Sequence, residues 1–177
     1  MLPLRFGAAM ATLEAVAGEL LAVHHERFAA ALAELEGRAE YVVKGRYVEA
    51  AVLAEVLSEN KQAARLRDRI GGKDPDATRP ERIQLGEIIN NAVTAKRQAD
   101  TSLVGDALHG HVVASAVREP THELDAVHVA LLVAIGKENR IRQAVQDLAR
   151  NWEGRIELRL LGPMAPYDFV ATLPPPL

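Results

Sequence analysis

The chain has 177 residues, of which 49% are hydrophobic but only 4% aromatic, and its formal net charge is −3. A chain of this length buries about 70% of its unfolded surface on folding, so we expect a self-sufficient core of Ala, Val, Leu and Ile. A pI near 6.1 gives no overall positive field to attract nucleic acid or anionic lipid. The absence of cysteine excludes disulfides, thiol catalysis and thiolate metal sites.

Neither a membrane segment nor a secretion signal is predicted. The longest strongly apolar run, residues 126–135, is too short to span a bilayer. The N-terminus lacks the basic lead and long apolar stretch of a signal peptide. We therefore expect a soluble, cytoplasmic protein.

Residues 1–37 form the first expected unit. Met1–Gly7 is typical of the end of a strand whose earlier part is missing, because an apolar segment capped by glycine has little reason to open a domain. Residues 12–36 then repeat apolar side chains every three or four positions, with glutamates mostly between them. This spacing predicts a long amphipathic helix.

The second expected unit, residues 38–170, opens with a strand. Residues 40–47 alternate, which places Tyr41, Val43, Gly45 and Tyr47 on one face and Val42, Lys44 and Arg46 on the other. Residues 50–70 have helical spacing, and the glycine- and proline-containing segment 71–76 is typical of an exposed loop. We interpret residues 50–78 as a helical insertion after the first strand.

A further long helix is predicted from residue 78 to about residue 109. Thr78 and Glu81 have the spacing of a capping box, in which the threonine side chain accepts a hydrogen bond from the first turn and the glutamate reaches back. Small alanines on the buried side would let this helix lie close to a sheet. The expected buried stripe comprises Leu85, Ile88, Ile89, Ala92, Ala95, Ala99, Leu103 and Ala107.

Two strands are expected next, at residues 111–117 and 126–134. The second is apolar on both faces apart from His128, which is typical of a central strand. Acidic hairpin tips are usually just solvated, so we predict no metal site in the loop between them. The loop nevertheless contains a set of residues of a kind that can bind a divalent metal, namely Glu119, His122, Glu123 and Asp125.

The chain closes with a helix, a strand and a tail. Residues 137–151 have helical spacing, and residues 155–161 alternate apolar with charged side chains, as a strand with one buried face does. Gly162 and Pro163 are expected to end that strand, because proline has no N–H to donate to a ladder. Residues 171–177 form a proline-rich tail, which is expected to be disordered or extended.

The order strand, helix, strand, strand, helix, strand predicts an α+β fold, a ferredoxin-like β-α-β-β-α-β sheet with extra helices. In that topology the first and third strands are central and the two main helices cover one face. The helix at residues 12–36, or a partner, would cover part of the other face. If the apolar side chains face the helices, the uncovered face presents the candidate partner-binding residues Lys44, Arg46, Arg155 and Arg159.

Three motifs resemble those of the gas vesicle protein GvpL/GvpF family. Leu2-Pro-x-Arg-Phe-Gly7 is similar to a segment of the family that has threonine in place of Ala8, and Glu40-Tyr-x-Val-Lys44 is similar to a family strand. Leu161-Gly-Pro-x-x-Pro-Tyr-x-Phe169 is similar to the family's C-terminal signature. Members of the family carry a further domain before the first motif. The motif residues that we expect to be structural are Arg5, Phe6, Gly7, Trp152, Gly162, Pro163, Pro166, Tyr167 and Phe169.

This resemblance implies a non-enzymatic accessory or minor structural protein of gas vesicles, located in the cytoplasm and at the vesicle. It further implies binding to the small, very hydrophobic shell protein, with other gas vesicle proteins as further partners, in support of vesicle assembly. The physics is compatible, because an amphipathic shell subunit would aggregate through its apolar surface unless it were held before incorporation. The resemblance implies no cofactor.

Two other classes of function follow from the residues alone. An enzyme is not expected, because the sequence has no H-E-x-x-H, G-x-S-x-G or phosphate-loop motif and hence offers no candidate catalytic or cofactor-binding residues. A ferredoxin-like RNA-binding module is the alternative, since the four basic strand residues supply positive charge. Tyr41 and Tyr47, however, alternate with those basic residues and are expected in the core. Neither nucleic acid nor a membrane is therefore the expected partner.

Overall fold

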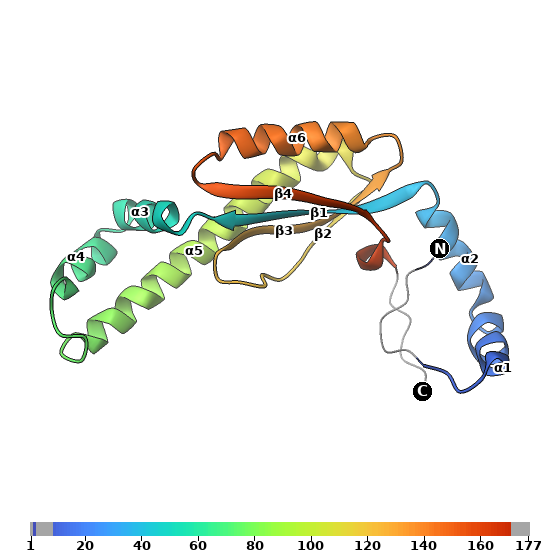
Figure 1. The fold of residues 1–177 in the computed structure, drawn as a ribbon, viewed down its shortest axis with the longest axis horizontal. Coiled ribbons are helices and arrows are strands. Elements are labelled where there is room, and N and C mark those ends of the chain that lie inside the picture. Colours follow the sequence, from blue (N-terminus) through green and yellow to red (C-terminus); the bar gives the residue numbers. More distant parts are fainter. Residues whose placement is uncertain (1, 3–8, 171–177) are drawn as a thin grey trace.

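The computed structural model describes residue 2 and residues 9–170, with a four-stranded antiparallel sheet at the centre (Figure 1). The order of the strands across the sheet is β2-β3-β1-β4. The predicted α+β class is confirmed, and the apolar segment 126–134 lies in a central strand as predicted. The strands are β1 (Arg38–Tyr47), β2 (Ala114–Val117), β3 (Asp125–Ala134) and β4 (Ile156–Met164).

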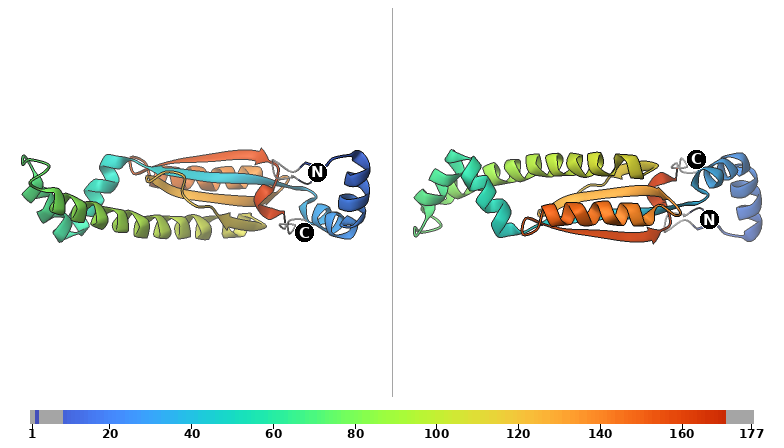
Figure 2. Two further views of the ribbon diagram at one scale, coloured as in Figure 1. Left: turned by 90° about the horizontal axis from the view of Figure 1, so that it is seen from below. Right: turned by 90° about the horizontal axis from the view of Figure 1, so that it is seen from above.

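One face of the sheet is covered by the helices α5 (Arg79–Leu108) and α6 (Glu138–Asn151). The view from above in Figure 2 shows α6 lying along the sheet with α5 beside it. Every second side chain of a strand points to this layer, so alternate apolar residues of β1 and β3 build the core. Its members include Tyr41, Val43, Tyr47, Val127, Val129, Leu131 and Val133 from the strands and Val93, Val104, Leu108, Ile141 and Val145 from the helices.

The opposite face, which we call the open face, has no long helix on it within residues 9–170. The view from below in Figure 2 shows the strands directly. Of the described chain, the β2–β3 loop and the short 3-10 turn η3 (Tyr167–Phe169) lie on this side of the sheet (Figure 1). Val42, Ala130 and Leu132 point to this side and are buried, so part of the open face is already covered.

Beyond one end of the sheet, α3 (Glu49–Glu59), α4 (Lys61–Ile70) and the first half of α5 form a projection (Figure 1). The predicted helical insertion is two helices rather than one. Asn60 separates them, and its side chain accepts hydrogen bonds from the N–H groups of Gln62 and Ala63 at 3.0 Å each. Asn60 is therefore the N-cap of α4.

At the other end, residues 9–37 form an N-terminal arm that points away from the sheet (Figure 1). The arm contains α1 (Leu13–Ala15), the π-helix η1 (Val16–Ala22) and α2 (His25–Leu35). The single continuous helix predicted for this region is thus interrupted. None of the arm's residues is buried. The arm does not cover the open face, so the expectation that this helix covers it is wrong.

The buried stripe of α5 differs from the predicted one in its C-terminal half. The buried residues are Val93, Asp100, Val104 and Leu108. The predicted members Ala95, Ala99, Leu103 and Ala107 are exposed. Alanines occur on several sides of this helix, so the spacing of its alanines did not show which side is buried.

Thr78 does not cap α5 in the predicted way. Its hydroxyl donates to the carbonyl oxygen of Asp74 at 2.9 Å and accepts from Arg82 Nε at 3.1 Å. No side-chain hydrogen bond caps the first turn. The predicted capping box is therefore wrong, although the predicted start of the helix is confirmed.

Two strand boundaries lie elsewhere than predicted. β2 begins at Ala114, because the preceding His109–His111 forms the 3-10 turn η2. β4 continues through Gly162 and Pro163 to Met164, where its register with β1 shifts. An edge strand tolerates proline, because the missing N–H is not needed for a second neighbour.

Some expectations lie outside the described residues. They are the strand remnant with Arg5, Phe6 and Gly7, and the proline-rich tail at residues 171–177. None of the described helices combines the length and the apolarity needed to cross a membrane.

Candidate partner-binding face

The open face brings basic side chains from the four strands into one row. Lys44 on β1 lies opposite His128 on β3 and Arg159 on β4. The N–H of Arg118, directly after β2, donates to the carbonyl oxygen of His128 at 2.8 Å. Residues paired across neighbouring strands point to the same face. We call Arg118, His128, Lys44 and Arg159 the basic row.

Three of the four candidate partner-binding residues lie on the open face. They are Lys44 and Arg159 of the basic row, and Arg46 opposite Glu157 of β4. The side chain of Arg46 is 51% exposed and that of Lys44 is 32% exposed. Arg159 is exposed and has no ion-pair partner within the described residues. The structure thus brings these three together on one surface.

Arg155 does not lie on the open face, and this part of the prediction is wrong. β4 begins at Ile156, so the strand alternation does not extend back to Arg155, which is the last residue of a turn. Its guanidinium donates from Nη1 and Nη2 to the two carboxylate oxygens of Asp100 on α5, at 2.9 Å each. Nε donates to Glu55 of α3 at 2.7 Å. Arg155 therefore joins the sheet to the projection rather than facing a partner.

Asp100 is the centre of a polar network that sequence reasoning missed. The hydroxyl of Tyr47 donates to Asp100 Oδ2 at 2.6 Å, and burial together with this bond raises the pKa of Tyr47. Lys96 Nζ lies 3.1 Å from Glu55 Oε2. Burial favours a higher pKa of Glu55, but Arg155 and Lys96 outweigh it and hold the pKa below its ordinary value. The network fixes the direction of the projection relative to the sheet.

Asp125 fixes the β2–β3 loop to the open face. This side chain is only 1% exposed, and Oδ2 accepts hydrogen bonds from the N–H and hydroxyl of Thr121 at 2.8 Å and from the N–H of His122 at 3.0 Å. Burial favours a higher pKa of Asp125, but these bonds and the charge of Lys44, 3.9 Å away, hold the pKa below its ordinary value. The expectation of a solvated loop tip is therefore wrong for this residue.

The other members of the predicted polar cluster, Glu119, His122 and Glu123, are exposed. Asp125 Oδ1 has no hydrogen-bond partner and lies 3.7 Å from Arg46 Nη2. Nowhere in residues 9–170 do three His, Asp or Glu side chains come together in a way that could hold a metal ion. Within this cluster, the buried Asp125 holds the β2–β3 loop in place, and the other three residues are at the surface.

Glu40 fastens the turn η3 to the open face. It is fully buried, and accepts a hydrogen bond from Arg118 Nη2 at 2.7 Å and another from the N–H of Asp168 at 3.0 Å. Arg118 Nε also donates to the carboxylate of Asp168 at 2.5 Å. Burial raises the pKa of Glu40. Arg118 is thus engaged, and Lys44 Nζ donates to Thr121 Oγ1 at 2.9 Å beside Asp125, so Arg159 is the most available charge of the basic row.

The described C-terminal motif residues take different positions. Trp152 is half-buried and packs against the core, and Pro166 is buried. Gly162 has a φ of 128°, and a Cβ at this position would lie 2.8 Å from Tyr41 Cδ1. The others are Pro163 and Tyr167, which are exposed, and Phe169, which is half-buried.

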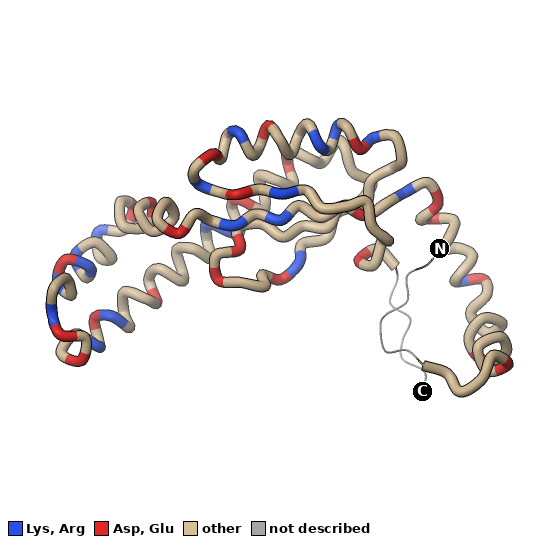
Figure 3. The backbone as a smooth tube through the Cα atoms, viewed as in Figure 1, with Lys and Arg blue, Asp and Glu red and all other residues tan. Residues whose placement is uncertain are grey.

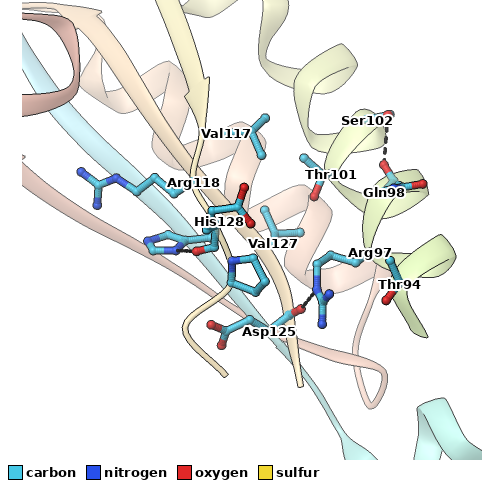
Figure 4. Close-up of a pocket in the computed structure, with 12 residues that line it drawn as sticks. Thr94, Arg97, Gln98, Thr101, Ser102, Val117, Arg118, Asp125, Val127 and His128 are labelled. Atoms are coloured by element: carbon cyan, nitrogen blue, oxygen red, sulfur yellow. Dashed lines mark hydrogen bonds between the residues drawn. The ribbon is translucent and has the colours of Figure 1, made fainter. Parts of the chain in front are cut away.

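A shallow hollow of about 430 Å³ lies between α5 and the β2–β3 loop (Figure 4). Arg97 of α5 reaches across to the loop and donates from Nε to the carbonyl oxygen of Asp125 at 2.5 Å. The hydroxyl of Ser102 donates to the carbonyl oxygen of Gln98 at 3.0 Å. This serine is therefore not oriented toward a base, as a nucleophile would be. The hollow's polar groups hold the loop against the helix.

The strand aromatics lie away from the open face. Tyr41 and Tyr47 are 3% and 2% exposed and belong to the core under α5 and α6. This confirms the prediction that they are core residues. The strands β2, β3 and β4 contain no Phe, Tyr or Trp, so the described sheet lacks the row of large aromatic side chains with which such sheets stack RNA bases.

Fold and face together define an α+β protein with a sheet covered by helices on one side only and a basic row on the other. The family model described as "Gas vesicle synthesis protein GvpL/GvpF" matches residues 1–171. The chain belongs to this family.

Individual relatives agree with this assignment. The chain is 30% identical over 174 residues to gas vesicle protein F of a Streptomyces species, covering 96% of this chain and 70% of that protein. It is 24% identical over 169 residues to gas vesicle protein F of Dolichospermum flosaquae, with 96% and 68% covered.

Two crystal structures have a similar fold. They are those of GvpF from Anabaena sp. PCC7120, with a TM-score of 0.79, and from Microcystis aeruginosa, with a TM-score of 0.75. Each is 24% identical in sequence and matches 97% of this chain and 70% of the solved chain.

Proposed function

We propose that the protein is a non-enzymatic accessory or minor structural protein of gas vesicles, which acts in the cytoplasm and at the vesicle. In this proposal it binds the hydrophobic shell protein and supports its assembly. The observation that carries the proposal is the open face, a sheet surface without helical cover in a member of a gas vesicle synthesis family. We also infer that the sheet is ferredoxin-like, which the strand order β2-β3-β1-β4 supports.

The open face offers both kinds of contact that an amphipathic partner needs. Leu161 of β4 is 45% exposed on this face, opposite Val42 of β1. Lys44 and Arg159 lie side by side near this apolar pair. A shell subunit held here would cover apolar surface, while the basic residues would set its orientation and speed its encounter.

The test is co-expression of the tagged chain with a gas vesicle shell protein, scored by the amount of shell protein that stays soluble and co-elutes. We expect co-elution with the unmodified chain and its loss in Lys44→Glu/Arg159→Glu. The control is Arg140→Glu/Arg142→Glu, which makes the same charge change on exposed positions of α6, across the sheet from the open face. Equal loss in both variants would reject the open face as the binding surface. Aggregation of the shell protein beside the unmodified chain would reject shell binding by this chain.

A further inference from the structure

The two ends of the molecule carry opposite charge. The N-terminal arm, residues 9–37, contains five glutamates and one arginine, a net charge of −4. The distal tip, which we define as residues 61–82 at the far end of the projection, contains seven lysines and arginines and four acidic residues, a net charge of +3. In Figure 3 the arm and the tip lie at opposite ends of the long axis, with the sheet between them. They therefore cannot meet within one molecule.

The charges of the distal tip are available for contact. Lys61, Arg65 and Arg69 are four residues apart on α4, which places them on one side of the helix. All three are exposed, and none has an ion-pair partner within the described residues. The other side of α4 packs on α5 through the buried Ala63 and Leu66. The stripe thus points outward from the tip.

Two glutamates of the N-terminal arm are equally unpartnered. Glu14 and Glu19 are exposed and have no ion pair within residues 9–170. Near them in the chain lie apolar side chains that a folded monomer leaves in water, because Leu13 is 82% exposed, Leu21 50% and Val23 68%. At the distal tip, Ile83 is 55% exposed at the start of α5. Each end therefore has exposed apolar side chains next to charged ones.

We propose that these ends bind each other between copies of this chain, the acidic N-terminal arm of one copy seating on the basic α4 stripe of the next. Two acidic arms repel each other, as do two basic tips, so charge disfavours a two-fold contact between like ends. A contact between unlike ends leaves one arm and one tip free on every pair, so further copies add in the same direction. The partner is a second copy because one sequence supplies both complementary surfaces.

The test is sedimentation velocity on the purified chain, without shell protein, over a series of protein and salt concentrations. At about 50 mM salt we expect the weight-average mass to rise with protein concentration to at least about twofold the 19.2 kDa of the monomer. At about 0.5 M salt it should return to the monomer mass, because charges in water are then screened. A mass that stays monomeric at low salt, or association that salt does not weaken, overturns the proposal.

Charge reversal tests the pairing itself. Glu14→Lys/Glu19→Lys brings the net charge of the arm from −4 to 0, and Arg65→Glu/Arg69→Glu brings that of the distal tip from +3 to −1. Each variant alone then lacks one of the two opposite charges and should stay monomeric. Mixed in equal amounts, the two should associate again, because each supplies the end that the other lacks. Arg140→Glu/Arg142→Glu on α6 is the matched control and should associate like the unmodified chain. If the unmodified chain associates but the mixture does not, the proposed pairing is wrong. The salt series tests the proposal without any variant.

Discussion

Arg155 binds both carboxylate oxygens of Asp100, and this bidentate pair joins the start of β4 to the middle of α5. Asp100 has a side chain that is only 6% exposed. It accepts a further hydrogen bond from Tyr47, whose ring lies under the guanidinium at 5.6 Å. A buried carboxylate of this kind depends on its arginine, because an unpaired charge in the interior is strongly unfavourable.

Arg155→Ala is therefore expected to lower the free energy of unfolding by about 3 kcal/mol, because it leaves Asp100 buried without a counter-charge. Arg155→Lys keeps the charge but loses the bidentate geometry, so its loss should be intermediate. Arg159→Ala, an exposed arginine on β4 without an ion pair, should change stability by less than about 0.5 kcal/mol. Urea unfolding followed by circular dichroism measures all three. Similar losses for Arg155→Ala and Arg159→Ala would contradict the anchoring role.

Gly162→Ala is expected to destabilise the protein by roughly 2 kcal/mol. Gly162 has a φ of 128°, and an added Cβ would lie 2.8 Å from Tyr41 Cδ1 and 2.9 Å from the carbonyl oxygen of Glu40. Gly86→Ala is the matched change at an exposed position inside α5, where a Cβ has nothing within 4 Å. There alanine should stabilise by about 0.5–1 kcal/mol, since it favours the helix. The same thermal or urea unfolding experiment compares them, and the prediction fails if the two substitutions shift stability in the same direction.

Asp125→Asn is expected to change how stability depends on pH. The pKa of Asp125 in the folded protein lies below its ordinary value, so the unfolded chain takes up this proton first as the pH falls. The stabilisation by Asp125 is therefore complete above the ordinary aspartate pKa of about 3.9 and is lost as the pH falls through the lower folded pKa. Melting temperatures should show the variant less stable than the unmodified protein near neutral pH, with the difference shrinking below about pH 4. A difference that stays constant over that range would contradict the ionised role of Asp125.

Deletion of residues 1–36 is expected to change the melting temperature by less than about 4 °C, which corresponds to less than about 1 kcal/mol. None of the described residues of the arm is buried, so its removal takes little apolar surface from the core. The N–H of Ile135 bonds to the carbonyl oxygen of Gly37 at 2.8 Å, and the deletion keeps this bond. Scanning calorimetry of both forms is the measurement. A drop of more than about 8 °C would show that the arm packs on the sheet in solution.

Local patterns predicted the elements well where one face of an element is apolar. Tyr41 and Val43 alternate with Val42 and Lys44, so the sequence predicted both the strand and the side on which Lys44 lies. The same alternation misplaced Arg155, because the face of that residue depends on where the strand begins, and a turn ends only at residue 155.

The network around Asp100 could not be derived from spacing. Its contacts join residues that lie 53 and 55 positions apart in the chain, and such pairs become neighbours only once the helix has packed on the sheet. One local signal existed, since Asp100 lies seven positions after the buried Val93 and four before Val104. An acidic residue at that spacing on a buried stripe indicates a hidden basic partner.

The unbroken length of α5 affects how a row of copies would present its open faces to a partner. Its 30 residues span about 45 Å, which carries the projection clear of the sheet, while the N-terminal arm extends beyond the other end. In a row of copies joined end to end, every open face would stay uncovered, and neighbouring faces would be separated by one molecular length. Such a row would offer shell subunits a series of equivalent binding faces. A partner that bound several faces at once would be held more tightly than by any single face.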